Sequence, residues 1–347
     1  MKKNLKTYFQ DIHYNRLKPN IFLSFGLRIA ELFYKTVILA KNELYKKEIL
    51  KEQKVNAYVI CIGNLTTGGV GKTPIVAELA KKLSKEKKVA IISRGYGAKL
   101  SNKEPNIIRD FSEIKFKNGN LCGDEPYQLA KKLDNAVIIT CANRVKASNF
   151  AIEKYGVEII ILDDGFSNRT IKKDETIIVV DSKMRFGNGH LLPLGPLREP
   201  IERINEADKI IVVDKGDNEI KNAIDYFSQF NKPINLCKMK PRKIYNLLTK
   251  AEVKIIEKQN IIAFCAIGQP EQFYNFVNQF YNIVETVSFA DHHKYSLSDI
   301  NYLIKLAKKH NISNFITTQK DETKLKDLIS ATTGYNFNVL ELENTIE

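Results

Sequence analysis

Residues 57–74, AYVICIGNLTTGGVGKTP, place a short apolar run, a glycine-rich turn and the start of a helical pattern in immediate succession. The run Ala57–Ile62 is rich in residues that favour β-strands. The apolar spacing over Ile75–Leu83 is typical of an α-helix. A strand, a glycine loop and a helix in this order form the setting of a phosphate-binding loop. The stretch therefore predicts an α/β protein that binds a nucleoside triphosphate.

The residue types of this loop match the chemistry of phosphate binding. Glycines let backbone N–H groups turn toward phosphate oxygens, and the N-terminus of the following helix adds its dipole. Lys72 is expected to contact the outer phosphates, and the Thr73 hydroxyl is expected to bind Mg²⁺. The strict motif begins with Gly where this chain has Thr66, so a purely structural glycine turn is the alternative. The predicted nucleotide-contacting residues of the loop are Thr66, Gly68, Gly69, Val70, Gly71, Lys72 and Thr73.

A second strand pattern ends in carboxylates. The apolar run Val157–Leu162 leads directly into Asp163, Asp164 and Gly165. In nucleotide-binding α/β proteins an acidic residue at such a strand end holds Mg²⁺, directly or through water. The alternative is an ordinary turn, since Asp-Gly is a common turn pair. The phosphate loop upstream favours the metal role.

Alternation of strand and helix patterns continues along the chain. It predicts an α/β fold with a doubly wound, mostly parallel sheet of the P-loop NTPase type, a second smaller α/β lobe and an N-terminal amphipathic helix. Ligands of such sheets bind at the carboxyl ends of the strands. The expected parts are an N-terminal helical arm over 1–50, a P-loop core over 51–228 and a smaller C-terminal α/β lobe over 229–347. The expected strands are Ala57–Ile62, Val89–Ser93, Ala136–Cys141, Val157–Leu162, Thr176–Asp181, Lys209–Asp214, Ile261–Ala266, Ile283–Phe289 and Asn314–Thr318.

The composition constrains the partners and the compartment. Lys and Arg number 54 against 40 Asp and Glu, a formal charge of +14 that suits an anionic partner or a basic solvated surface. No aromatic and basic pattern of a nucleic-acid module accompanies this charge, so nucleic acid is not an expected partner. The five cysteines are scattered and mostly lie in apolar runs, which predicts buried reduced thiols in a cytoplasmic protein.

Residues 21–40, IFLSFGLRIAELFYKTVILA, are apolar enough to raise the question of a membrane span. Ser24, Arg28, Glu31 and Lys35 fall on one helical stripe, and three charges would be poorly hidden in a bilayer. One interpretation is a helix lying in the membrane interface with this stripe in water. The other is a helix packed on the protein's own core. Basic residues that would suit anionic head groups precede it, namely Lys2, Lys3, Lys6, Arg16 and Lys18.

Several motifs, taken in order along the chain, resemble one family, the tetraacyldisaccharide 4'-kinases of lipid A synthesis. Thr66 at the start of the phosphate loop also fits the pattern of that family. One difference is that the family's usual DDGFQHR is DDGFSNR here, with Ser167 and Asn168 in place of Gln and His. The matching segments are Gly63–Pro74, Ser93–Gly97, Gly123–Pro126, Leu162–Phe166, Leu191–Pro200, Asp291–Tyr295 and Thr317–Leu325.

The resemblance implies an activity and a location. ATP would phosphorylate the 4'-hydroxyl of a tetraacylated glucosamine disaccharide 1-phosphate, with Mg²⁺ as cofactor, on the cytoplasmic face of the inner membrane. The lipid disaccharide and the membrane surface would be the partners. The implied metal site comprises Thr73, Asp163, Asp164 and Glu125. Tyr96, Arg144 and Arg198 would contact the nucleotide, and Glu199 also falls in a family motif.

The resemblance further implies that Asp124 is the catalytic base and that His292 assists it. A carboxylate near the γ-phosphate can accept the proton of a sugar hydroxyl, which is otherwise a poor nucleophile. The alternative for Asp124 is an N-cap of a helix, with Pro126 shortly after it. The alternative for His292 is a loop or surface histidine. The two residues fall in different expected lobes, so the acceptor site is expected in a cleft.

Two switch-type proteins are the main alternatives. Membrane-targeted partitioning ATPases have Lys immediately before the paired glycines, and this chain has Thr67 there. A GTPase would read guanine with N-K-x-D, and residues 214–217 read DKGD after a strand pattern. A competition between ATP and GTP for binding would distinguish these possibilities.

Overall fold

The computed structural model describes residues 5–96, 98–116, 119–214, 219–255, 258–268, 270–290, 293–330, 332 and 334–347. They form two compact units. The first comprises Met1–Lys238 with Ile346–Glu347, and the second comprises Met239–Thr345. The chain passes from one unit to the other within strand β8 (Ile234–Asn246).

The first unit is built on a sheet with the strand order β8-β7-β6-β1-β5-β2-β4-β3. All pairs in this order are parallel except β3 with β4, which is antiparallel. The strands are β1 (Tyr58–Gly63), β2 (Val89–Ser93), β3 (Asn106–Arg109), β4 (Ala136–Thr140), β5 (Ile159–Asp163), β6 (Glu175–Asp181), β7 (Lys209–Val213) and the first part of β8.

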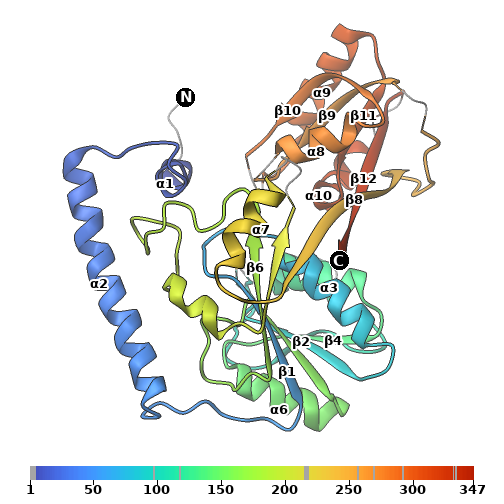
Figure 1. The fold of residues 1–347 in the computed structure, drawn as a ribbon. Helices are drawn as coiled ribbons and strands as arrows, with labels where there is room; N and C mark the ends of the chain where they lie inside the picture. Colours follow the sequence, from blue (N-terminus) through green and yellow to red (C-terminus); the bar gives the residue numbers. More distant parts are fainter. Residues whose placement is uncertain are drawn as a thin grey trace. The chain divides into compact units, whose positions relative to one another are not determined.

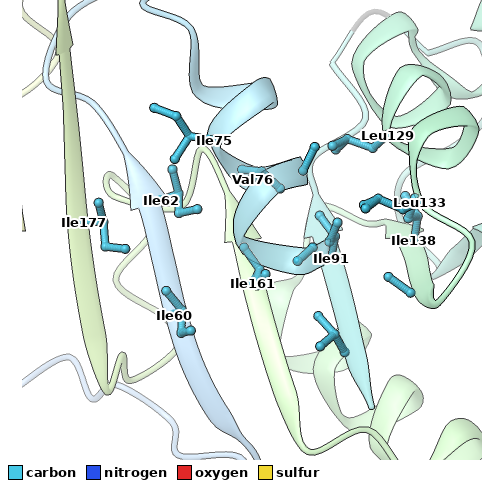
Figure 2. Packing of buried hydrophobic residues seen from close by; sticks show 14 of the residues in the cluster. Ile60, Ile62, Ile75, Val76, Ile91, Leu129, Leu133, Ile138, Ile161 and Ile177 are labelled. Atoms are coloured by element: carbon cyan, nitrogen blue, oxygen red, sulfur yellow. The ribbon is translucent and has the colours of Figure 1, made fainter. Parts of the chain in front are cut away.

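Helices cover both faces of this sheet because both faces are apolar (Figure 1). On one face, Ile75 and Val76 of α3 and Leu129 of α5 pack against isoleucines of β1, β2 and β5 (Figure 2). On the other face α6 packs against Val59 and Ile160, and α7 against β6 and β7. The helices of this part are α3 (Lys72–Leu83), α4 (Gly119–Cys122), α5 (Asp124–Lys132), α6 (Arg144–Tyr155), α7 (Ile220–Ser228) and the 3₁₀ helix η1 (Ile201–Glu206).

Two helices precede the sheet, α1 (Leu5–His13) and the long α2 (Ile21–Lys46, blue in Figure 1). The N-terminus of α2 is capped by Asn20, whose side chain accepts from the N–H of Leu23 at 2.8 Å. Leu27 is buried, whereas most apolar side chains of the helix are exposed. No helix within the described residues is long and apolar enough to cross a bilayer.

The second unit has the strand order β10-β9-β11-β12-β8. Helices α9 and α10 pack on one face of it, and α8 packs on the other. Its elements are the later part of β8, β9 (Asn260–Cys265), α8 (Pro270–Val277), β10 (Asn282–Ser288), α9 (Leu297–His310), β11 (Asn314–Thr318), α10 (Gln319–Ile329) and β12 (Asn336–Ile346).

The predicted doubly wound α/β class is confirmed, and each of the expected strands is present with bounds that differ by at most two residues. The sequence analysis missed the long strands β8 and β12. Lys, Arg, Asn and Glu interrupt their apolar patterns, and only parts of them are buried. All five cysteines are buried, as predicted.

Candidate active site

The phosphate loop and the acidic pair lie side by side because β1 and β5 are adjacent and parallel. Ile62 of β1 pairs with Asp163 of β5, and the N–H of Asp164 donates to the carbonyl of Ile62 at 3.0 Å. A side chain at Gly63 would overlap Phe166, so the chain after β1 can pass the acidic turn only with glycine at this position. The carboxyl ends of the two strands therefore form one site, as the fold class predicts.

The loop has the backbone geometry that its glycines were expected to supply. Gly68 and Gly71 have φ values of 110° and 97°, in the region that favours glycine. Thr66 is buried and forms a β-bridge with Leu197. Helix α3 begins at Lys72, so Lys72 and Thr73 occupy its first turn, where free N–H groups and the helix dipole favour an anion.

Lys72 belongs to a charged network that joins three segments of the chain. Its Nζ lies 2.9 Å from Oδ1 of Asn64 and 3.4 Å from Oδ1 of Asp164. The Arg198 guanidinium donates to both carboxylate oxygens of Asp164, at 2.9 and 2.8 Å. Such a two-point contact fixes the carboxylate more firmly than a single bond would. Arg198 also donates to the side-chain oxygen and the backbone carbonyl of Asn64, so Lys72 and Arg198 converge on the same amide oxygen.

The two neighbouring aspartates have opposite electrostatic properties. Asp163 is buried, and burial together with the nearby Glu125 raises the pKa of its carboxyl to about 7. Asp164 retains 40% side-chain exposure, and Arg198 and Lys72 hold the pKa of its carboxyl well below the usual range despite partial burial. Lys72 and Arg144 therefore offset the burial of Asp163 only in part, whereas Arg198 and Lys72 contact Asp164 directly.

Helix α5 presents Asp124 and Glu125 in its first turn, and both side chains are exposed. Gly123, with a φ of 96°, occupies the N-cap position, so the interpretation of Asp124 as an N-cap is wrong. The Asp124 carboxylate approaches Gly119, where an added Cβ would lie 2.8 Å from Oδ1. Glu125 is close enough to Asp163 to affect its pKa.

The remaining predicted residues of the first unit differ in exposure. Arg144 is the first residue of α6, is buried and donates to the carbonyl of Cys141. Burial lowers the pKa of its guanidinium, which the nearby Asp163 and Asp164 partly offset. Tyr96 is 91% exposed. Glu199 is buried and pairs with Arg203 at 2.7 Å, a contact that supports η1.

Some predicted features lie outside the described residues. These are Gly97, His292 and the greater part of the DKGD segment, 215–217. Among the described residues, no group of three or more His, Cys, Asp or Glu side chains could hold a metal ion. A Mg²⁺ bound with a nucleotide takes several ligands from phosphates and water, so it does not require such a cluster.

The sequence analysis did not assign Asn64. The signal was its place in the motif, directly after the strand and before the glycines. Of the two substituted motif residues, Asn168 accepts from the N–H and the hydroxyl of Thr170, at 3.0 and 2.8 Å, and so stabilises a local turn. Ser167 contributes its backbone carbonyl, which accepts from Nζ of Lys41 at 2.9 Å.

Comparison with known proteins decides the family. The profile described as "Tetraacyldisaccharide-1-P 4'-kinase" matches residues 23–347. The chain belongs to the tetraacyldisaccharide-1-P 4'-kinase family. It is similar to the tetraacyldisaccharide 4'-kinase of Halothermothrix orenii, with 33% identity over 99% of this chain and 94% of that protein. It is also similar to the enzyme of Francisella tularensis subsp. novicida, with 35% identity over 92% of this chain and 95% of that protein.

The fold matches a solved member of this kinase family. The crystal structure of the "apo" form of LpxK from Aquifex aeolicus in complex with ATP gives a TM-score of 0.73. It is 31% identical and covers 94% of this chain and 95% of that one. The resemblance predicted from the motifs is thus confirmed, and the shared architecture extends over nearly the whole kinase chain.

Proposed function

We propose that this protein transfers the γ-phosphoryl group of Mg²⁺–ATP to the 4'-hydroxyl of a tetraacylated glucosamine disaccharide 1-phosphate. Family membership makes it an ATP-dependent lipid A 4'-kinase. The observation that carries the mechanism is the joined end of β1 and β5, where a phosphate loop, its lysine and two aspartates meet. The family match favours the kinase over a nucleotide switch protein.

The nucleotide would be held by the loop from Thr66 to Thr73. Backbone N–H groups of the loop and the first turn of α3 face the phosphates, and Lys72 neutralises their charge. Arg198 and Asn64 keep the Lys72 ammonium at the mouth of the loop. Arg144 and Tyr96 are assigned to the nucleotide from their motifs, and Arg144 adds a buried positive charge beside the aspartates.

The acidic pair fits a divalent cation. A buried carboxylate whose pKa is raised gains most from a metal ion, and the pKa of Asp163 stays raised although Lys72 and Arg144 oppose the shift. Asp163, the Thr73 hydroxyl, Asp164 and Glu125 would hold it. When bound, Mg²⁺ neutralises charge on the β- and γ-phosphates. Because Arg198 and Lys72 already neutralise Asp164, we expect Asp163 to be the more important of the two aspartates for the metal.

Asp124 would act on the acceptor. The 4'-oxygen attacks the γ-phosphorus, a new O–P bond forms and the bond to the β–γ bridging oxygen breaks, releasing ADP. The hydroxyl proton passes to the Asp124 carboxylate, which is exposed and therefore accessible to an acceptor. The assisting role of His292 rests on its motif alone.

The outer face of α2 supports binding to a lipid surface. Phe22, Phe25, Ile29, Leu32 and Phe33 are between 56% and 87% exposed. Helical geometry places them on one side, opposite the buried Leu27. A contiguous apolar face of this kind is suited to the interface between head groups and acyl chains, where the lipid acceptor also resides. The cytoplasmic face of the inner membrane is the compartment we propose.

Transfer of labelled γ-phosphate from ATP to a tetraacyl disaccharide 1-phosphate tests the function, with mass spectrometry to locate the new phosphate. The wild type should label the 4'-position. Lys72→Ala should abolish transfer, and Asp124→Asn should lower kcat by about 10²–10⁴-fold with little change in ATP affinity. A folded Lys72→Ala variant with near-normal turnover would exclude this mechanism. Preferential binding of GTP would favour the switch alternative.

A further inference from the structure

The inner face of α2 differs from the outer one. It carries polar side chains that bond to backbone groups of three other segments. Glu31 accepts from the N–H of Leu191 at 2.8 Å. Tyr34 donates its hydroxyl to the carbonyl of Arg198 at 3.0 Å, and Lys41 donates to the carbonyl of Ser167 at 2.9 Å. The interpretation that placed Glu31 in water is therefore wrong, because its carboxylate faces the segment 190–191.

Two of these segments carry the charged network of the active site. The Arg198 guanidinium donates two hydrogen bonds to the Asp164 carboxylate. Ser167 lies three residues after Asp164, in the turn that follows β5. The backbone of Arg198 is held on both sides. Its N–H donates to the carbonyl of Leu65 at 2.7 Å, directly before the phosphate loop, and its carbonyl accepts from Tyr34.

We propose that Tyr34 and Lys41 are positioning residues for phosphoryl transfer, and that α2 fixes the two backbone segments from which Arg198 and Asp164 meet at Lys72. Tyr34 acts through Arg198, and Lys41 acts through the turn that holds Asp164. This inference rests on the proposed function for the reaction that it affects. It concerns the inner face of α2, which is distinct from the apolar face suited to lipid.

Small displacements at this point have large consequences. The contacts of Asp164 with Arg198 and Lys72 are 2.8 to 3.4 Å long, and their strength depends on that geometry. A catalytic group displaced by about 1 Å can cost on the order of 10²-fold in rate. Loss of one hydroxyl bond to a carbonyl should allow a smaller displacement, since the Leu65 bond remains.

The test begins with Tyr34→Phe, which keeps the ring that packs against the core of the first unit and removes only the hydroxyl. We expect kcat to fall about 3- to 10-fold, the usual effect of one lost hydrogen bond. The KM for ATP and for the acceptor should stay within twofold. Thr36→Val is the matched control, because the Thr36 hydroxyl donates within α2 itself, to the carbonyl of Leu32 at 2.9 Å.

A double-mutant cycle separates positioning from a general structural effect. If Tyr34 acts through Arg198, Tyr34→Phe should cost little in an Arg198→Ala background, since the group it positions is absent. Lys41→Met, introduced alone, should also lower kcat. Its effect should persist in the Arg198→Ala background, because Lys41 acts through the turn that holds Asp164. Full multiplication of the Tyr34 and Arg198 losses, or an unchanged kcat in Tyr34→Phe, would overturn the proposal.

The proposed function can fail separately. Absence of phosphate transfer by the wild type would exclude the lipid kinase reaction. The positioning inference would then still be tested with the same variants. Slow ATP hydrolysis without acceptor would then serve as the assay, because Lys72, Asp164 and Arg198 would still meet the γ-phosphate. Equal hydrolysis rates for wild type, Tyr34→Phe and Thr36→Val would overturn the inference in that case.

Discussion

Each unit has a buried carboxylate close to the carboxyl end of a parallel strand, Asp163 at the end of β5 and Asp321 in the first turn of α10 after β11. The two carboxylates have different surroundings. Asp321 of the second unit is fully buried, and its Oδ2 accepts from the N–H of Ala266 at 3.0 Å and from the Thr318 hydroxyl at 2.7 Å. Asp163 of the first unit forms no hydrogen bond through its carboxylate within the described part of the chain, and its pKa is raised to about 7. The comparison suggests that the first unit leaves its carboxylate for a ligand, whereas the second uses its carboxylate to hold the end of β9 to α10.

The largest expected effect separates the two carboxylates by activity. Asp163→Asn should lower kcat by about 10²–10³-fold, because a charge that the transition state depends on is lost. Asp225→Asn, at an exposed position of α7, is the control and should have no effect. The measurement is steady-state transfer over a range of Mg²⁺ concentrations. Near-normal activity of Asp163→Asn would show that Asp163 does not bind the metal. The functional difference between Asp163 and Asp321 would then be lost.

The second effect separates them by stability. Asp321→Ala should lower the free energy of unfolding of the second unit by about 3 kcal/mol, since two buried donors lose their acceptor. Hydrogen exchange should speed up in α10 and at the end of β9 and stay unchanged in α3. Unchanged protection of α10 would show that the Asp321 bonds contribute nothing to this unit.

The third effect has the opposite sign. A carboxyl with a raised pKa in the folded state costs stability once it ionises, so the cost grows from about pH 4 to about pH 7 and is complete above that. Asp163→Asn should therefore stabilise the ligand-free protein by about 2 kcal/mol at pH 8, about half of what the full shift would give, because relaxation weakens desolvation. The gain should shrink as the pH approaches 5. Thermal melting at several pH values without nucleotide measures it. A constant or negative difference would contradict the raised pKa of the Asp163 carboxyl.

The smallest expected effect concerns the helix cap beside Asp321. Thr318 caps α10, and its hydroxyl both accepts from the N–H of Asp321 and donates to the Asp321 carboxylate. Thr318→Val should cost about 1 kcal/mol in unfolding free energy, as lost N-caps do. Thr318→Ser keeps the hydroxyl and should restore most of it. Denaturant titration of both variants measures the difference, and equal stability would show that the cap is dispensable.

The sequence alone predicted those features that depend on local patterns. The glycine spacing of 68–71 predicted the loop and the first turn of α3, and apolar runs predicted the parallel strands. It could not predict the contacts of Arg198, because Arg198 and Asp164 are 34 residues apart and only the fold brings them together. Periodicity also misplaced Glu31. Periodicity shows which side chains share a face of a helix. It does not show which of these faces packs against the rest of the protein.

The attachment of α2 has a consequence for how the sequence of this family can vary. Tyr34 and Lys41 both bond to carbonyl oxygens, which every residue possesses. The side chain at position 167 can therefore change while the acceptor of Lys41 remains. Ser167, where the family resemblance implies Gln, therefore keeps this contact. Over evolutionary time, positions 34 and 41 are expected to vary less than position 167, a pattern that comparison of many relatives would reveal.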